Sequence, residues 1–286
     1  MSRTLPFLAL LVGCISQREA EDPSEWFDKG SALDVTEALT FTDQSYDFPA
    51  NPNDGIGWLK DHVFPVEGSG FGSDTVAWGP DDATNRDITC ANVSDPALPF
   101  DIEGVATAHP RFYFKTTGCT WDSDEKYYGS FFIQDATGGV FVLGDSKLAH
   151  FDMGDRVRIR ARAAKTSFDL DMIYAFDLVE VVERNVPIYY EEPTAPFVDL
   201  WEAGDDPTGQ VWRVTGEVVT RTDTFGEFQV EDDEGRRFHA SLDMEINRRG
   251  IEFPVGSRVT ITGPVLYSYS IFAIVITRKG QVTVHD

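Results

Sequence analysis

From residue 97 onward, short runs of the chain alternate apolar and polar positions, the period of half-buried β-strands. The pattern occurs twice: runs at 100–105, 132–142, 151–161 and 172–182 correspond to runs at 212–218, 228–240, 253–263 and 271–276. The closest match sets Phe-Asp-Met-Gly-Asp-Arg-Val-Arg-Ile-Arg-Ala against Phe-Pro-Val-Gly-Ser-Arg-Val-Thr-Ile-Thr-Gly. This internal repeat predicts two tandem all-β domains.

Glycine pairs mark the turns of each copy. A Gly-Gly pair and a Glu-Gly pair supply positive φ for the hairpin between the second and third strands. Gly-Asp at 154–155 and Gly-Ser at 256–257 turn the chain into the fourth strand. A small helix fits before that turn, at Asp145–His150 and Leu242–Arg249. Five strands with this helix are the layout of the OB-fold, so we expect two five-stranded OB-fold-like barrels.

The hairpin at Phe132–Val142 and the strand entry at Met153–Val157 resemble those of exported bacterial OB-fold modules. The resemblance covers 97–183 well and 209–284 less well, since the second copy lacks the Gly-Gly pair. Such modules occur in extracellular nucleases and surface lipoproteins, usually without catalytic activity. The resemblance therefore implies a binding or spacer role and does not name a ligand.

The start of the chain has the layout of an export signal. Arg3 precedes an apolar run, Leu5–Val12, that is shorter than the ~20 residues needed to span a bilayer. The Leu-Val-Gly-Cys sequence that ends at Cys14 resembles the lipobox of bacterial lipoproteins. The resemblance implies cleavage before Cys14 and acylation of this cysteine, with palmitate as a typical chain. Ile15 and Ser16 lack the aspartate of inner-membrane retention, which favours the outer membrane. The alternative is a secreted protein whose signal happens to end near a cysteine.

These observations divide the chain into six parts. They are a signal peptide, a lipidated tether, a loop-rich acidic segment that packs on the first barrel, the first barrel, an acidic linker with a short helix, and the second barrel. The expected bounds are 1–13, 14–30, 31–96, 97–185, 186–208 and 209–286.

The formal net charge is -24, and the acidity lies mainly before the first barrel and in the linker. Such a surface repels phosphate backbones, which argues against nucleic acid as a partner. It leaves the lipid bilayer, reached through acylated Cys14, and an envelope protein or a glycan. No cofactor is expected. No second apolar run of about 18 residues follows Cys14, so lipid is the membrane attachment that the sequence offers.

Two cysteines remain beyond the lipidated one. Cys90 and Cys119 could form a disulfide, since an exported protein folds in an oxidising compartment. The alternative is a pair of free buried thiols.

The loop between the first two strands is much longer in the first copy. It carries Trp121, Asp122, Asp124, Tyr127 and Tyr128. In OB-folds this loop flanks the ligand face, where aromatic rings stack on a sugar or a base or anchor a protein partner. The alternative is that the rings cover the barrel and contact the loop-rich segment.

Arginine occupies every second position of the fourth strand in the first copy, at Arg156, Arg158, Arg160 and Arg162. A period of two places these side chains on one face of the strand. They form either a basic stripe for a phosphate or sulfated glycan, or a salt-bridge ladder with Asp101 and Glu103 of the neighbouring strand. The ladder predicts that Arg158 or Arg160 pairs with one of these carboxylates.

Signals for catalysis or metal binding are weak. The acidic runs at 122–125 and 231–234 could hold Ca²⁺ but lack the spacing of an EF-hand loop. The five histidines show no metal-binding spacing, and no Gly-x-Ser-x-Gly motif occurs. We therefore expect no enzymatic activity. The predicted role is binding of a ligand or protein partner, and the alternatives are an accessory module of an extracellular nuclease or other hydrolase system and a structural spacer.

Overall fold

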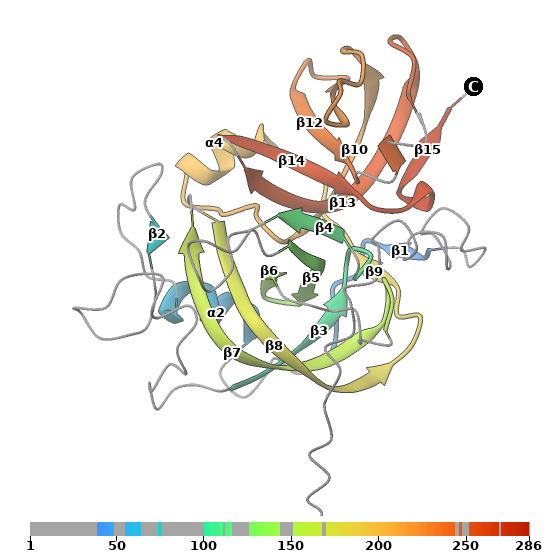
Figure 1. Ribbon diagram of the computed structural model, residues 1–286. Coiled ribbons are helices and arrows are strands. Elements are labelled where there is room, and N and C mark those ends of the chain that lie inside the picture. Colours follow the sequence, from blue (N-terminus) through green and yellow to red (C-terminus); the bar gives the residue numbers. More distant parts are fainter. Residues whose placement is uncertain are drawn as a thin grey trace, which may run out of the picture.

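The strands are wound into two closed sheets that lie one above the other in Figure 1. The structure is a computed structural model, and it describes residues 39–48, 55–63, 74–75, 100–110, 112–115, 126–143, 151–167, 170–243, 246–247, 252–268 and 270–285. Cys14, Cys90 and Cys119 lie outside these residues, as do Trp121, Asp122 and Asp124.

The first barrel runs in the order β3-β5-β6-β8-β7 and closes by pairing of β7 with β3. Its strands are β3 (Phe100–Ala106), β5 (Lys126–Asp135), β6 (Gly138–Leu143), β7 (Arg156–Ser167) and β8 (Leu170–Glu183). β6 and β8 are parallel, and the other neighbours are antiparallel. Two short strands extend the sheet, β2 (Asp74–Thr75) beside β7 and β4 (Phe112–Lys115) beside β5.

The second barrel repeats this topology as β10-β11-β12-β14-β13, closed by β13 and β10. Its strands are β10 (Val211–Val218), β11 (Glu227–Asp232), β12 (Arg237–Leu242), β13 (Arg258–Ser268) and β14 (Ile271–Ile276). A 3-10 helix, η1 (Lys279–Gln281), leads into β15 (Val282–Val284), which pairs with β13. Both barrels have the strand order of the OB-fold, so the predicted fold class is confirmed.

The same turn enters the fourth strand of each barrel. Gly154 and Gly256 both have φ of 90°, which a side chain would strain. The inward positions of each barrel form a separate core, with Ile133 and Val140 in the first and Val230 and Phe238 in the second. The repeated sequence pattern therefore produces two copies of one architecture.

Each barrel core also contains a helix that precedes its first strand. In the first barrel, α2 (Gly55–Val63) buries Ile56 and Leu59 in the core. In the second barrel, α4 (Phe197–Glu202) buries Phe197 and Leu200. The segments before the barrels are thus part of the packing. Ile246, in a helical turn between β12 and β13, is also buried in the second core.

A third cluster joins the two barrels. β1 (Phe41–Thr42) pairs in parallel with β9 (Ile188–Tyr189) of the linker. The linker then bonds to the start of β10, where Arg213 N donates to Glu191 O at 2.8 Å. Val105 of the first barrel and Val211 of the second lie in one buried cluster with Ile188. The linker is therefore packed between the barrels.

Candidate functional site

Of the predicted aromatic site, the structure describes the backbone of Tyr127 and Tyr128. Tyr127 and Tyr128 lie on β5, where they pair with Phe114 and Tyr113 of β4. Their side chains lie outside the part of the structure that is described. The assignment of a ligand to this loop therefore stays a prediction.

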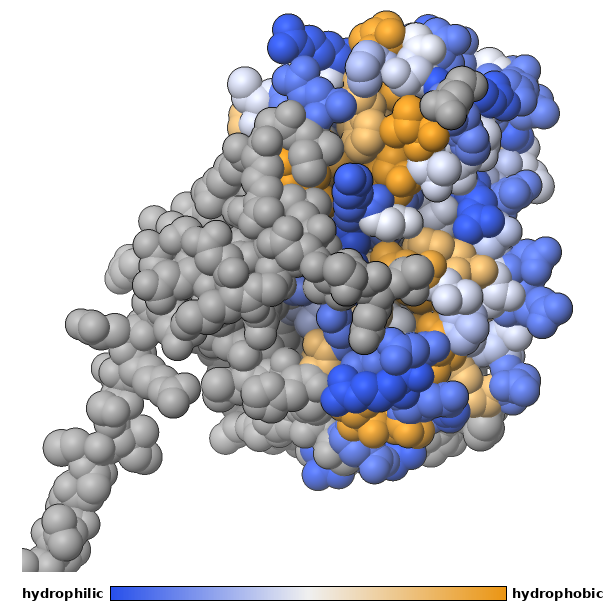
Figure 2. Space-filling model, turned by 90° about the vertical axis from the view of Figure 1, so that its right-hand side faces the viewer, coloured by the Kyte–Doolittle hydropathy of each residue, from blue (hydrophilic) through white to orange (hydrophobic). Residues whose placement is uncertain are grey.

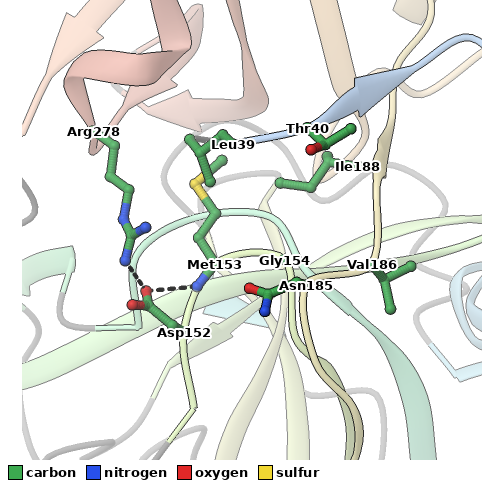
Figure 3. A pocket seen from close by; sticks show the side chains of 9 residues that line it. All are labelled: Leu39, Thr40, Asp152, Met153, Gly154, Asn185, Val186, Ile188 and Arg278. Atoms are coloured by element: carbon green, nitrogen blue, oxygen red, sulfur yellow. Dashed lines mark hydrogen bonds and ion pairs between the residues drawn. The ribbon is translucent and has the colours of Figure 1, made fainter. Parts of the chain in front are cut away.

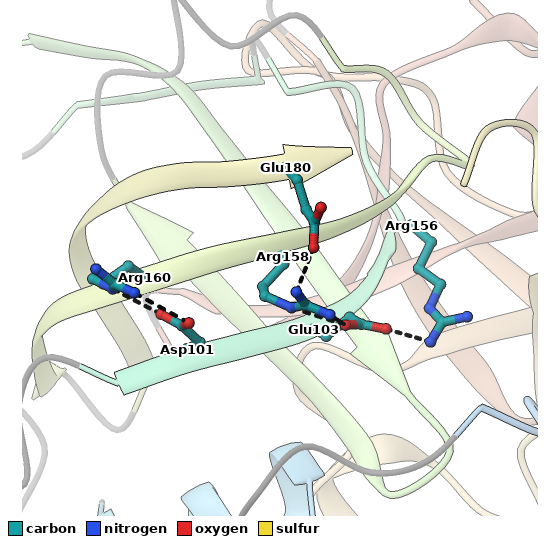
Figure 4. A network of polar contacts seen from close by, with 6 residues as sticks. All are labelled: Asp101, Glu103, Arg156, Arg158, Arg160 and Glu180. Carbon is teal, nitrogen blue, oxygen red and sulfur yellow. Dashed lines mark hydrogen bonds and ion pairs between the residues drawn. The ribbon is translucent and has the colours of Figure 1, made fainter. Parts of the chain in front are cut away.

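The arginines of β7 form the predicted salt-bridge ladder (Figure 4). Arg158 Nη2 lies 2.6 Å from Glu103 Oε2, and Arg160 Nε lies 2.8 Å from Asp101 Oδ1. Glu103 is 6% exposed and also pairs with Arg156. The expected ion pairs are confirmed because β3 and β7 set Glu103 opposite Arg158 and Asp101 opposite Arg160.

The environment of the ladder agrees with a structural role. The hydrogen bond from Arg160 holds the pKa of Asp101 below its ordinary value. In the second barrel, hydroxyls replace the equivalent charges: Thr215 Oγ1 lies 2.8 Å from Thr260 Oγ1. Every described arginine of the stripe thus has an acidic partner, and these carboxylates occupy the guanidinium groups that a phosphate would need.

The acidic run at 231–234 is held by arginines. Asp232 Oδ2 accepts a hydrogen bond from Arg236 Nε at 2.6 Å, and Asp233 lies 2.8 Å from Arg258. The run borders a groove of about 200 Å³ together with Glu192 and Arg213. Among the described residues, no group of three or more His, Cys, Asp or Glu side chains is placed to hold a metal ion.

Strands two and three form the usual ligand face of an OB-fold. In the first barrel the outward pair on this face is Phe132 opposite Phe141, with ring centroids 5.0 Å apart. The two side chains are 0% and 1% exposed. The next outward residue, Gln134, is also buried, and its Oε1 accepts a hydrogen bond from Val211 N of the second barrel at 2.9 Å. This face is therefore closed in the assembled chain.

The start of the second barrel packs against this face. Gly139 and Gly209 approach so closely that a Cβ on Gly139 would lie 2.1 Å from Gly209 O. β13 contacts β8, and Ala273 and Val275, which point away from the core of the second barrel, are buried. The two barrels are therefore in direct contact.

A small pocket of about 40 Å³ lies at this junction (Figure 3). Arg278 of the second barrel is 4% exposed and pairs with Asp152 of the first. Met153, Thr40 and Ile188 complete the wall, so the pocket is shared by both barrels, the linker and the amino-terminal segment. Its size suits ordered water, and its ion pair fastens the barrels.

The corresponding face of the second barrel is open and polar. Gln229 and His239 occupy the positions that Phe132 and Phe141 have in the first barrel. In each hairpin, the outward pair lies one position further from the turn than a pair of core residues, Val230–Phe238 in the second barrel and Ile133–Val140 in the first. This register corrects the sequence alignment, which set Phe132 against Phe228: Phe228 points inward, whereas Phe132 points outward.

Hydrogen bonds and an ion pair cross the open face. Gln229 Nε2 lies 3.0 Å from His239 Nε2, and Arg237 Nε donates to Glu231 at 2.8 Å. Burial lowers the pKa of His239 below its ordinary value, which keeps the ring neutral at pH 7. These polar side chains are half-buried or exposed, so they can exchange partners with a ligand. Sequence reasoning missed this face because its motif is weaker than that of the first copy.

The surface seen in Figure 2 is mainly hydrophilic, with hydrophobic residues in separate groups. The described residues contain no helix that is long and apolar enough to cross a membrane.

Comparison with known proteins gave similarity to solved structures alone: no family model and no curated protein matches the chain. A structure of the tetrameric p202 HIN2 domain is 14% identical, with a TM-score of 0.32, over 66% of this chain and 93% of that one. A murine DNA-binding protein bound with double-stranded DNA is 10% identical, with a TM-score of 0.32, over 65% and 97%. A replication protein A heterotrimer bound to single-stranded DNA is 12% identical, with a TM-score of 0.30, over 65% and 48%.

The expectation against nucleic acid as a partner is corrected. It rested on net charge, and two of these similar structures hold DNA. Net charge describes the whole chain, whereas a binding face has its own local charge.

Proposed function

We propose that this chain is a non-enzymatic binding protein that acts through the β11–β12 face of its second barrel. The contrast between two equivalent faces carries the proposal. Phe132 and Phe141 are buried, whereas Gln229 and His239 remain accessible at the same register positions. A chain that closes one ligand face and leaves the other polar and open has one OB face available for a ligand.

We further propose that the protein is exported and tethered by an acyl chain on Cys14, with the outer membrane as its site. The Leu-Val-Gly-Cys sequence supports this proposal. Labelling cells with a radioactive fatty acid tests the anchor: the label should enter the wild-type protein and be absent from the Cys14→Ala variant. Equal labelling of both proteins would refute it.

A double variant of the open face, Gln229→Glu with His239→Glu, tests the binding role. Both changes add charge to accessible strand positions without removing core residues. The wild-type protein, purified from gently solubilised host membranes, should retain a bound species that the double variant loses. Thr283→Glu on exposed β15 is the matched control and should retain it.

Nuclease treatment of the purified complex shows whether the bound species is nucleic acid. Retention of the same species by the double variant would contradict the proposed face, and so would its loss in the Thr283→Glu control.

A further inference from the structure

We infer that the groove beside Arg213 binds a small zwitterion of the amino-acid class, with the ligand carboxylate on Arg213 and its ammonium group near Glu192. β10, the turn between β11 and β12, and the linker residues Glu192 and Pro193 line this groove. Its volume of about 200 Å³ is below the roughly 300–1,000 Å³ of sites for drug-sized ligands, and it suits one free amino acid. Gln229 and His239 do not line the groove, so the inference goes beyond the proposed function.

Arg213 differs from the other arginines of the chain in having no acidic partner. Among the arginines whose side chains the structure describes, every other one forms an ion pair: Arg156, Arg158, Arg160, Arg184, Arg221, Arg236, Arg237, Arg258 and Arg278. The chain has 48 acidic residues against 24 lysines and arginines, so a carboxylate partner is the expected state of an arginine. The half-buried side chain of Arg213 therefore keeps its charge for a ligand.

The guanidinium group of Arg213 is fixed before a ligand binds. Its Cζ lies 3.5 Å from the centre of the Tyr190 ring, and its Nε donates to Thr262 Oγ1 at 3.1 Å. The backbone N of Arg213 donates to Glu191 O at 2.8 Å, which joins β10 to the linker. Within the described residues the two Nη atoms have no hydrogen-bond partner, and this end of the planar group can hold a carboxylate through two parallel bonds.

The turn between β11 and β12 forms a wall whose charges are already paired. Asp232 and Glu234 pair with Arg236, and Asp233 pairs with Arg258 of β13. Asp232 Oδ1 also accepts hydrogen bonds from Glu234 N at 3.0 Å and Arg236 N at 2.9 Å, which fixes the backbone of the turn. These side chains therefore shape the groove and leave its free charges to other residues.

Glu192 supplies the free negative charge. It is exposed, and it is the lining carboxylate that has no arginine or lysine partner in the described part of the chain. The groove thus presents one free guanidinium group and one free carboxylate. A ligand with a carboxylate and an ammonium group complements both, whereas a simple anion would meet the surrounding carboxylates without compensation.

Ligand-observed NMR titration of the purified protein tests the inference with three probes: glycine, β-alanine and 4-aminobutyrate. These zwitterions differ in the distance between their two charges, so the series covers the spacing that the groove requires. At least one of them should bind. Acetate and methylammonium, which each carry one of the two charges, should bind at least ~10-fold more weakly, since each forgoes one charge-assisted contact.

Variants assign the binding to the groove. Arg213→Gln should weaken binding of the zwitterion by about 10- to 100-fold, because it removes charge-assisted hydrogen bonds. Arg221→Gln is the matched control: it removes the same charge from an arginine that pairs with Glu252 outside the groove, and it should bind as the wild type does. Glu192→Gln changes an exposed side chain and should weaken binding by roughly 2- to 5-fold, the effect of an exposed ion pair.

The inference is overturned if none of the three zwitterions binds, if Arg213→Gln binds as tightly as the wild type, or if acetate binds as tightly as the zwitterion. Loss of binding in Arg221→Gln would overturn it as well. If Arg213→Gln does not fold, Glu192→Gln decides, and unchanged binding by this variant contradicts the inference. The double variant of Gln229 and His239 should bind the zwitterion normally, so a failure of the proposed face and a failure of the groove are distinguishable.

Discussion

The contact between the barrels can be tested by adding one methyl group at its tightest point. In Gly139→Ala the new Cβ would lie 2.1 Å from Gly209 O and 2.7 Å from Gln210 N. Both neighbours are backbone atoms, so no flexible side chain can move aside. The barrels must separate locally by roughly 1 Å, because carbon and oxygen atoms in contact stay more than 3 Å apart.

The expected loss of stability has two parts. Overpacking of a close contact costs about 1–3 kcal/mol. The displacement also stretches the hydrogen bond from Val211 N to Gln134 Oε1, now 2.9 Å, and a buried group left without a partner costs about 1–3 kcal/mol. We therefore expect the free energy of unfolding to fall by about 2–6 kcal/mol, a large share of the stability of a typical protein.

Urea unfolding followed by tryptophan fluorescence measures this loss. With a slope of about 2–3 kcal/mol/M, the midpoint should fall by roughly 0.7–3 M. Gly280→Ala is the matched control: its Cβ would meet Leu39 Cδ1 at 3.4 Å, an ordinary contact, so its midpoint should stay close to that of the wild type. Equal midpoints for the two variants would refute the close packing of the barrels.

Four further substitutions test individual side chains. Glu103→Gln should lower the free energy of unfolding by up to about 3–5 kcal/mol in urea titrations, because its two arginine partners keep their charge without a buried carboxylate. Asp101→Asn, at the more exposed end of the ladder, should lower it by about 0–1 kcal/mol. Burial and Asp223 raise the pKa of Glu227 above 4.5, so the fold favours the protonated carboxyl and loses stability as pH rises and the group ionises. Glu227→Gln keeps this side chain neutral and should therefore raise the melting temperature at pH 7 but not at pH 4. The pKa of His239 is lowered from 6.5, so the fold favours the neutral ring and stability falls as pH drops below about 6.5. The melting temperature of His239→Gln should fall less over this range than that of the wild type, and equal falls would contradict the role of this ring.

The two barrels and the salt-bridge ladder could be predicted from the sequence because both depend on a period of two. Alternation sets which side chains share a face, and the repeat fixed which strands correspond. Once β3 and β7 are recognised as neighbours, Arg158 must lie near Glu103. These features need only local pattern and the known strand order of the fold.

The contact between the barrels could not be predicted in the same way. Phe131 and Phe132 are adjacent and equally hydrophobic, yet Phe131 faces its own core and Phe132 lies on the covered outer face. Nothing in the local pattern distinguishes a second barrel from a ligand as the cover. The helix α2 was not predicted for a related reason: it is short, and the core that it completes lies in strands later in the chain. A short helix was expected in the linker, where α4 lies, but its burial in the second core could not be predicted from the local pattern.

Hydroxyl-radical footprinting read by mass spectrometry tests the central claim most directly, since it reports the solvent exposure of single side chains. The account predicts slow oxidation of Phe132 and Phe141, which are 0% and 1% exposed, and fast oxidation of Phe225, which is 76% exposed. Oxidation of Phe132 and Phe141 at a rate close to that of Phe225 would show that the ligand face of the first barrel is open, and would contradict the account.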